Sequence, residues 1–206
     1  MYTDYFNSRK TLAAFCFATV TYCNTTLAST TIVGYDFEDP TGSFENVPET
    51  SIFGLDPEPW FDVQGSLTDF TGNPGRALAA RTFLDGNAMV LVVNVLPGFS
   101  AMVDGYSFDH LASASGPMNW QLKINDLPIA DGVTSTSFSS VNGGLSLPDI
   151  NDSIIVELFG SAASSNSGTY RLDNFVLSGT VTPVPLAPSI VLFSSALAFV
   201  STRFKR

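Results

Sequence analysis

The sequence has few of the side chains on which common enzymatic chemistry depends. It contains one histidine, His110, and two cysteines, Cys16 and Cys23, which both lie near the N-terminus. The rest of the chain therefore has no thiol for a disulfide, a zinc–thiolate centre or a cysteine nucleophile. It also has no nucleophile elbow, phosphate-binding loop or metalloprotease motif. We expect no catalytic residue, and hence no enzyme.

Basic residues are scarce as well. The chain has 9 Lys and Arg against 19 Asp and Glu, and five of the basic residues lie near the two ends. Residues 29–182 hold 18 acidic and 4 basic side chains, and hence a net charge near −14. Nucleic acids and anionic lipids attract basic surfaces, so we expect no nucleic-acid partner. An acidic domain is suited to staying soluble or to holding divalent cations.

Residues 29–182 also lack a sustained helical period. They show eight to ten apolar or alternating segments, separated by turn signals about every ten residues. In the clearest segment, 118–124, Met118, Trp120, Leu122 and Ile124 share one face. The pattern predicts an all-β fold, an antiparallel β-sandwich. We favour a jelly roll, in which the first and last strands are adjacent.

The same pattern places the individual strands and turns. We expect an irregular segment at 44–59, a turn at 72–75, hairpin turns at 85–87 and 142–144, and a polar loop at 161–168. In strand 100–111, His110 shares a face with Tyr106 and Phe108, and Asp109 points the other way. We therefore interpret His110 as structural. The expected strands are 31–38, 60–63, 77–84, 88–96, 100–111, 118–124, 133–141, 153–159 and 170–181.

The N-terminal segment has the pattern of an export signal. Arg9 and Lys10 precede an apolar stretch at 11–23, and small residues follow at 27–29. A positive region, an apolar region of about a dozen residues and a small-residue exit are typical of a secretory signal peptide. We expect cleavage after Ala28, so that residues 1–28 form a signal helix and residues 29–182 the exported domain.

The C-terminal tail, residues 183–206, has three parts in a fixed order. A proline-bearing motif comes first, an apolar run at 190–200 follows, and basic residues close the chain. The run is short against the roughly 20 residues of a comfortable membrane span, and the cations favour a cytoplasmic C-terminus. We predict a C-terminal transmembrane helix. The motif residues are Val184, Pro185, Leu186, Ala187 and Pro188, and the membrane-stop residues are Arg203, Lys205 and Arg206.

This tail resembles the bacterial PEP-CTERM sorting signal, most closely its VPLPA variant. Two residues of the motif are interchanged here, Ala187-Pro188 in place of Pro-Ala, and the following Ser189, Ile190, Leu192 and Phe193 fit the variant. The resemblance implies secretion through the inner membrane of a Gram-negative bacterium and cleavage near the motif by an exosortase-type enzyme. It also implies a place among the exopolysaccharide and biofilm proteins of the cell surface or extracellular matrix.

The best-motivated site for a small ligand is a cation site. Asp36, Glu38 and Asp39 cluster at the first strand and Asp173 lies in the last, so a jelly roll that pairs these strands would bring them together. Hard Ca²⁺ takes six to eight oxygen ligands. The domain resembles carbohydrate-binding modules of the galactose-binding-like sandwich type. That resemblance implies a structural calcium ion at Glu38 and Asp173 and no other cofactor.

Aromatic side chains near polar groups suggest where a sugar would bind. Trp60 in the acidic loop region and Tyr106 are the expected ligand platforms, whereas Trp120 lies on an apolar strand face and is expected in the core. The leading function is a secreted, non-enzymatic protein of an exopolysaccharide matrix. The alternative is a carbohydrate-binding module that recognises the polysaccharide. A glycan hydrolase or lyase that uses two carboxylates is the third possibility.

Overall fold

The computed structural model describes residues 30–65 and 67–184 of the 206-residue chain. The expected signal peptide lies outside this range. So does the sorting tail beyond Val184, with its expected transmembrane helix and basic end. Within the described range, no helical segment has the length and hydropathy that a membrane crossing requires.

All the regular structure in the described range is β-strand. The strands are β1 (Thr30–Tyr35), β2 (Thr50–Ser51), β3 (Leu55–Pro57), β4 (Phe61–Asp62), β5 (Thr68–Thr71), β6 (Arg76–Ala80), β7 (Asn87–Val95), β8 (Phe99–Ala112), β9 (Asn119–Ile124), β10 (Leu127–Val133), β11 (Ser139–Gly144), β12 (Ser153–Ser161) and β13 (Tyr170–Pro183).

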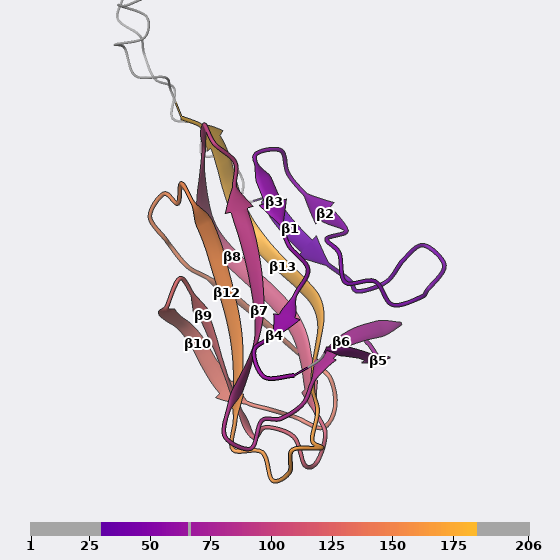
Figure 1. Ribbon diagram of the computed structural model, residues 1–206. Coiled ribbons are helices and arrows are strands. Elements are labelled where there is room, and N and C mark those ends of the chain that lie inside the picture. Colours follow the sequence, from indigo (N-terminus) through magenta and orange to yellow (C-terminus); the bar gives the residue numbers. More distant parts are fainter. Residues whose placement is uncertain (1–29, 66, 185–206) are drawn as a thin grey trace, which may run out of the picture.

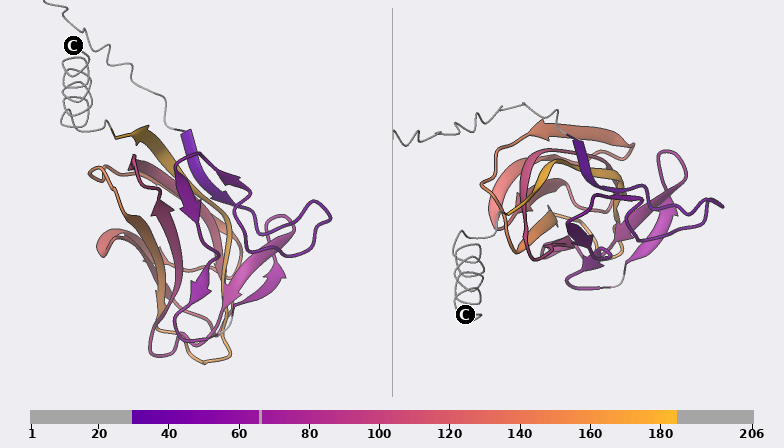
Figure 2. Two further views of the ribbon diagram at one scale, coloured as in Figure 1. Left: turned by 45° about the horizontal axis from the view of Figure 1, so that its top comes forward. Right: turned by 90° about the horizontal axis from the view of Figure 1, so that it is seen from above.

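The strands form two antiparallel sheets that face each other (Figures 1 and 2). The seven-stranded sheet has the order β11-β8-β13-β1-β2, and β6 joins β5 to β13. The six-stranded sheet has the order β10-β9-β12-β7-β3, with β4 also on β7. The predicted all-β antiparallel sandwich is confirmed. The first and last strands, β1 and β13, are adjacent as expected and pair from Thr30↔Gly179 to Tyr35↔Phe175.

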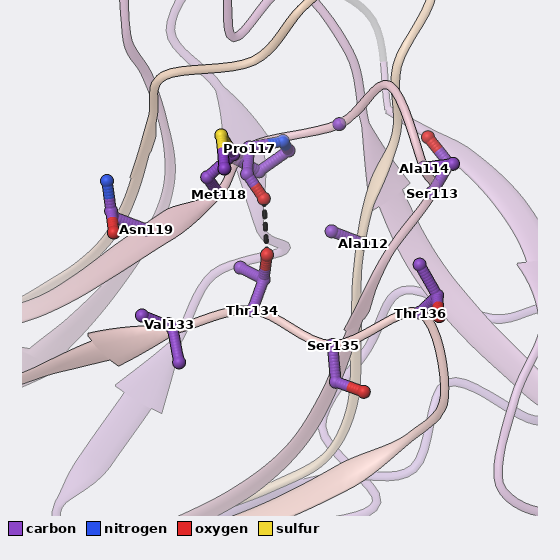
Figure 3. Close-up of a pocket in the computed structure, with 11 residues that line it drawn as sticks. Ala112, Ser113, Ala114, Pro117, Met118, Asn119, Val133, Thr134, Ser135 and Thr136 are labelled. Carbon is purple, nitrogen blue, oxygen red and sulfur yellow. Dashed lines mark hydrogen bonds between the residues drawn. The ribbon is translucent and has the colours of Figure 1, made fainter.

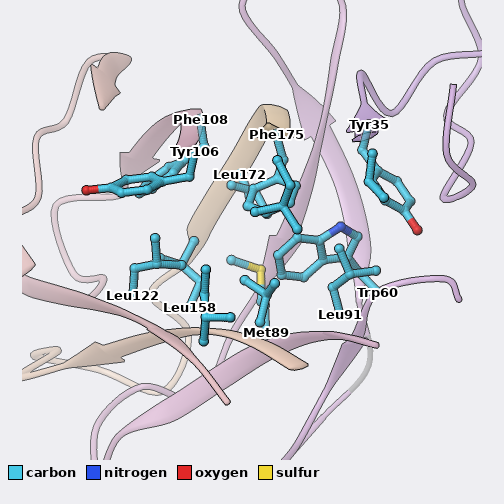
Figure 4. Close-up of a cluster of buried hydrophobic side chains, with 14 of the residues drawn as sticks. Tyr35, Trp60, Met89, Leu91, Tyr106, Phe108, Leu122, Leu158, Leu172 and Phe175 are labelled. Carbon is cyan, nitrogen blue, oxygen red and sulfur yellow. The ribbon is translucent and has the colours of Figure 1, made fainter. Parts of the chain in front are cut away.

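Side chains that alternate along the long strands fill the space between the sheets (Figure 4). In β9, Trp120, Leu122 and Ile124 are buried as predicted. Met118 is 65% exposed, because it precedes β9, so its predicted inward position is wrong. The largest fully buried side chains are Tyr35, Tyr170, Phe37, Phe83, Phe108, Phe175, Ile32, Leu78, Met89, Leu91, Leu122 and Ile124.

Two predicted hairpin turns are wrong. The 85–87 turn does not join neighbouring strands, because β6 pairs with β13 in one sheet and β7 with β12 in the other. The 142–144 segment is the end of β11, where Gly143 lies opposite Tyr106 of β8. A Cβ atom on Gly143 would lie 2.6 Å from the Tyr106 hydroxyl oxygen. The glycine therefore makes room for a packed ring and does not form a turn.

Candidate functional site

The two aromatic residues expected to form ligand platforms are core residues. Trp60 is 2% exposed and packs edge-on against Phe175, with ring centroids 4.9 Å apart, and against Tyr35 at 6.3 Å. Tyr106 is 8% exposed and stacks on Phe108. Both rings lie among the buried side chains of the core (Figure 4). The expectation of a ligand platform at Trp60 and Tyr106 is therefore corrected, because both rings fill the space between the sheets.

An exposed platform occurs instead on the outer face of the six-stranded sheet. Because Trp120, Leu122 and Ile124 of β9 point into the core, Asn119, Gln121 and Lys123 point outward. Cross-strand pairing extends these positions into rows of side chains. One row is Asp131 of β10, Gln121 of β9 and Phe159 of β12. The next row is Val133, Asn119 and Ser161.

These two rows line a groove of about 540 Å³. Its walls combine an aromatic ring, two side-chain amides, a carboxylate and a hydroxyl, with Val133 as the exposed apolar margin. Binding sites for small organic ligands combine apolar surface with a few placed polar groups in this way. The face of a pyranose offers C–H groups to a ring and hydroxyls to amides and carboxylates. The lining is therefore suited to a sugar.

The position of the Phe159 ring is set by its neighbours. The Lys123 ammonium nitrogen lies 5.9 Å from the ring centroid, within the range of a cation–π contact. The backbone of Gly86 meets the tip of the ring, where an added Cβ atom would lie 2.6 Å from Cζ. Gly86 also has a φ of 85°, which a larger residue would adopt only with strain. Together these contacts hold Phe159 on the floor of the groove.

A second cavity, of about 340 Å³, adjoins this groove, and its lining is drawn in Figure 3. It shares Asn119 and Val133 with the groove and is bounded by the segments before β9 and after β10. Thr134 donates a hydrogen bond from its hydroxyl to the Pro117 carbonyl and so ties the two segments together. Met118 lies on its rim. The two cavities give the surface room for more than one sugar unit.

The two residues expected to hold calcium, Glu38 and Asp173, contact the same loop. This loop, residues 72–75, joins β5 to β6. The Asn73 N–H donates to Asp173 Oδ2 at 2.5 Å, and the Arg76 N–H donates to Glu38 Oε1. Asp173 Oδ1 also accepts the Asn174 N–H at 2.8 Å. Glu38, shortly after the end of β1, and Asp173 of β13 thus lie close together, and each accepts a hydrogen bond from the loop or from the residue that follows it.

Asp173 is an unusual carboxylate because it is 1% exposed and lies among other acids. Its pKa is raised to about 6, chiefly by burial and to a smaller extent by the charges of Asp109 and Glu38, while two backbone N–H groups act to lower the pKa. Asp109 is bound by the Ser140 hydroxyl and by the Asn174 amide at 2.9 Å. The nearby Arg76 guanidinium instead pairs with Asp69 at 3.0 Å.

A metal ion bound between Glu38 and Asp173 would have few side-chain ligands. In the described part of the chain, no three His, Cys, Asp or Glu side chains converge on a metal position. Glu38 also lines an acidic cavity of about 330 Å³ with Asp36, Asp39, Glu45 and Glu49. Calcium at Glu38 and Asp173 would therefore take its remaining oxygens from backbone carbonyls of the 72–75 loop or from water. The residues present supply the charge for a cation but only part of its coordination.

His110 lies in the core. Its ring centroid is 5.5 Å from that of Trp120 and 5.8 Å from that of Tyr170. Burial lowers its pKa, although the charge of Asp109 opposes this. Nδ1 is buried without a hydrogen-bond partner among the described residues. A neutral imidazole enclosed by aromatic rings fits a structural residue, and solvent does not reach it.

Comparison with solved structures finds carbohydrate-binding modules of sandwich fold. The chain is similar to a variant of a family 29 module (14% identity, TM-score 0.44, covering 73% of this chain and 93% of that one). It is also similar to the CBM22-1 xylan-binding domain from Paenibacillus barcinonensis (15% identity, TM-score 0.41, covering 78% of this chain and 98% of that one). A third similar structure is the family 11 module from Clostridium thermocellum, in complex with a mixed-linked tetrasaccharide (13% identity, TM-score 0.39, covering 72% of this chain and 96% of that one).

An arabinose-bound α-L-arabinofuranosidase also matches, over 23% of its chain, with 14% identity and a TM-score of 0.39. No protein-family model matches the sequence, and no curated protein is similar to it. At these identities and scores the likeness is confined to the sandwich fold and says nothing of a ligand.

The residues of the groove were not singled out by the sequence. The available signal was the alternation in 118–124, which places Asn119, Gln121 and Lys123 on the solvent face. What the sequence does not contain is the register that sets Gln121 between Asp131 and Phe159.

Proposed function

We propose that this domain is a non-enzymatic carbohydrate-binding module that holds a polysaccharide in the groove on the outer face of the six-stranded sheet. The observation that carries the proposal is the row formed by Asp131, Gln121 and Phe159. A ring that is held by Lys123 and Gly86 offers an apolar surface, and the amide and carboxylate beside it supply oriented hydrogen-bond partners. Because these groups lie on regular strands, little conformational entropy is lost on binding.

The ligand is expected to be a neutral polysaccharide. The groove contains the carboxylate of Asp131, and residues 29–182 carry a net charge near −14. A uronate-rich chain would be repelled by this field. Lys123 is not part of the groove lining, and its ammonium group is engaged with the Phe159 ring. Neutral hydroxyls, by contrast, can donate to Asp131 and accept from Asn119 and Gln121.

The test is affinity electrophoresis of the full-length chain in gels that contain xylan, mixed-linked β-glucan, mannan, galactan or the host's own exopolysaccharide. We expect retardation by at least one of these. Phe159→Ala is expected to weaken the binding about tenfold, because stacking on an aromatic ring contributes up to about 1.5 kcal/mol. Gln121→Ala, which leaves the ring in place, is expected to weaken binding about fivefold, the loss of about one hydrogen bond.

Phe53→Ala is the matched control, because Phe53 is 83% exposed and does not line the groove. It should bind like the wild type. Equal binding by all the variants would place the site elsewhere. Retardation by none of the polysaccharides would overturn the glycan-binding function and leave a structural role in the matrix. Release of reducing sugar by the wild-type chain would show an enzyme.

We further propose that the domain is exported and sorted through its two ends, as a component of an exopolysaccharide-rich matrix. The support is the order of the C-terminal tail and the signal peptide in residues 1–28. Intact-mass spectrometry of the protein from extracellular and membrane fractions of its host should find a chain that begins near Ser29 and ends within 184–189. A membrane-bound chain that retains Arg206 would contradict processing by an exosortase.

A further inference from the structure

The free edges of the two sheets differ in how they are protected against pairing with another strand. On the six-stranded sheet, β10 carries Pro128 and a register shift before Ala130, and at the opposite side β3 ends in Pro57 and β4 has two residues. On the seven-stranded sheet, β2 also has two residues, and β5 carries the Asp69–Arg76 ion pair. Prolines, bulges, charges and very short strands are the usual protections of a sheet edge.

The remaining edge, β11, has none of these protections. It has six residues, Ser-Ser-Val-Asn-Gly-Gly, with no charge and no proline. It pairs with β8 from Ser139↔His110 to Gly144↔Gly105 without a register shift. Neither of its glycines has the positive φ seen at Gly42 and Gly98. Its outer side is therefore a regular, extended backbone, and among the described residues no other strand pairs with it.

We propose that β11 pairs with β11 of a second copy of this chain, antiparallel and about a twofold axis. The two seven-stranded sheets would then form one continuous sheet across the dimer. The strand is complementary to itself: with Asn142 opposite Asn142 of the second copy at the axis, Val141 lies opposite Gly143 and Ser140 opposite Gly144. Such a contact uses the same surface on both subunits, as twofold dimers do. The backbone supplies the hydrogen bonds, as in strand addition.

The charge around β11 favours an identical partner over a basic one. A cationic partner would be drawn to the acidic parts of the domain, whereas β11 has no ionisable side chain. The carboxylate nearest to the centre of β11 is that of Asp109 on the neighbouring strand β8. It accepts a hydrogen bond from the Ser140 hydroxyl. The overall negative charge repels a second copy, and salt screens this repulsion. Pairing with a second copy should therefore strengthen with salt, whereas pairing with a basic partner would weaken.

The test is sedimentation velocity of the full-length chain in a mild nonionic detergent, from about 1 to about 100 µM. We expect a monomer–dimer equilibrium that shifts to the dimer as NaCl rises from about 0.05 to about 0.5 M. Asn142→Asp places like charges directly opposite each other at the axis and should weaken the dimer about tenfold. Leu127→Asp adds the same charge to β10, where Leu127 is 51% exposed, and should leave the dimer unchanged.

Both variants retain the apolar run at 190–200, so association through that run would be insensitive to Asn142→Asp. That outcome would overturn the proposal, as would a monomer at every concentration and salt. An equal loss in the Leu127→Asp control would also overturn it, because the effect would then come from the added charge and not from its position on β11. Concentration-dependent protection of the backbone amides in 139–144 against hydrogen exchange would support it and would be absent in Asn142→Asp.

Discussion

Replacing Trp60 with alanine is expected to destabilise the domain by about 3–5 kcal/mol, the usual result of removing a buried tryptophan ring. The indole is 2% exposed and packs on Phe175 and Tyr35, so its removal leaves a cavity between the sheets. The backbone of Trp60 is fixed separately, because the Asn46 side chain bonds both its N–H and its carbonyl. Thermal or denaturant unfolding of the full-length chain measures the effect, with an expected fall in Tm of about 10 °C.

Phe53→Ala is the control for this substitution as well. Phe53 is 83% exposed and has an edge-on contact with Phe99, at 5.2 Å between ring centroids. Its removal should change the stability by less than about 1 kcal/mol. A Trp60→Ala chain that is as stable as the wild type but has lost its glycan binding would restore Trp60 as a ligand platform and contradict its place in the core.

The arrangement of the long strands could be predicted because each is buried on one face. This burial shows in the sequence as the period of two in 118–124 and as the apolar segments at 153–159 and 170–181. These three segments correspond to β9, β12 and β13. Pairing of β1 with β13 also placed Glu38 and Asp173 on one loop. Those two residues are far apart in sequence, so their approach followed from the expected topology.

The predictions that failed depended on information about spatial neighbours. Gly143 has the sequence context of a turn but is a glycine because the Tyr106 hydroxyl occupies the space of a side chain. Trp60 lies in a segment rich in acids and prolines, which suggests exposure, yet the neighbouring Phe61 is the exposed residue of the pair at 45%. Phe159 gained its partners Gln121 and Lys123 only through the register of β12 with β9.

The second large effect is expected in the pH dependence of stability, because Asp173 has a raised pKa. The pKa rises from 3.8 to about 6 on folding, so the folded chain binds more protons between these values. The stability from this group is complete below pH 3.8 and is lost as the pH rises through about 6. In EGTA the loss should be on the order of 3 kcal/mol.

Asp173→Asn should remove this loss of stability at higher pH. One of the two backbone N–H groups then faces the amide nitrogen, so we expect the variant to be less stable than the wild type in acid. His110, whose pKa is lowered in the folded chain, contributes in the opposite direction, because the unfolded chain binds the proton more readily as the pH falls below 6.5, but His110 is present in both chains. The difference between the wild type and Asp173→Asn at each pH therefore isolates Asp173. An equal pH dependence in the two chains would contradict the buried, partly protonated carboxylate.

Calcium should reverse the effect if it binds at Glu38 and Asp173, as we propose. An ion between the two carboxylates would neutralise the charge that burial disfavours, so millimolar Ca²⁺ should raise Tm near pH 7 and have little effect near pH 4. Glu38→Gln and Asp173→Asn should not respond, whereas Asp131→Asn, in the groove of the other sheet, should respond like the wild type. An unchanged Tm in calcium and in EGTA at neutral pH would exclude the ion. Asp173 would then be explained as a clamp for the 72–75 loop, and burial alone would favour its protonated form.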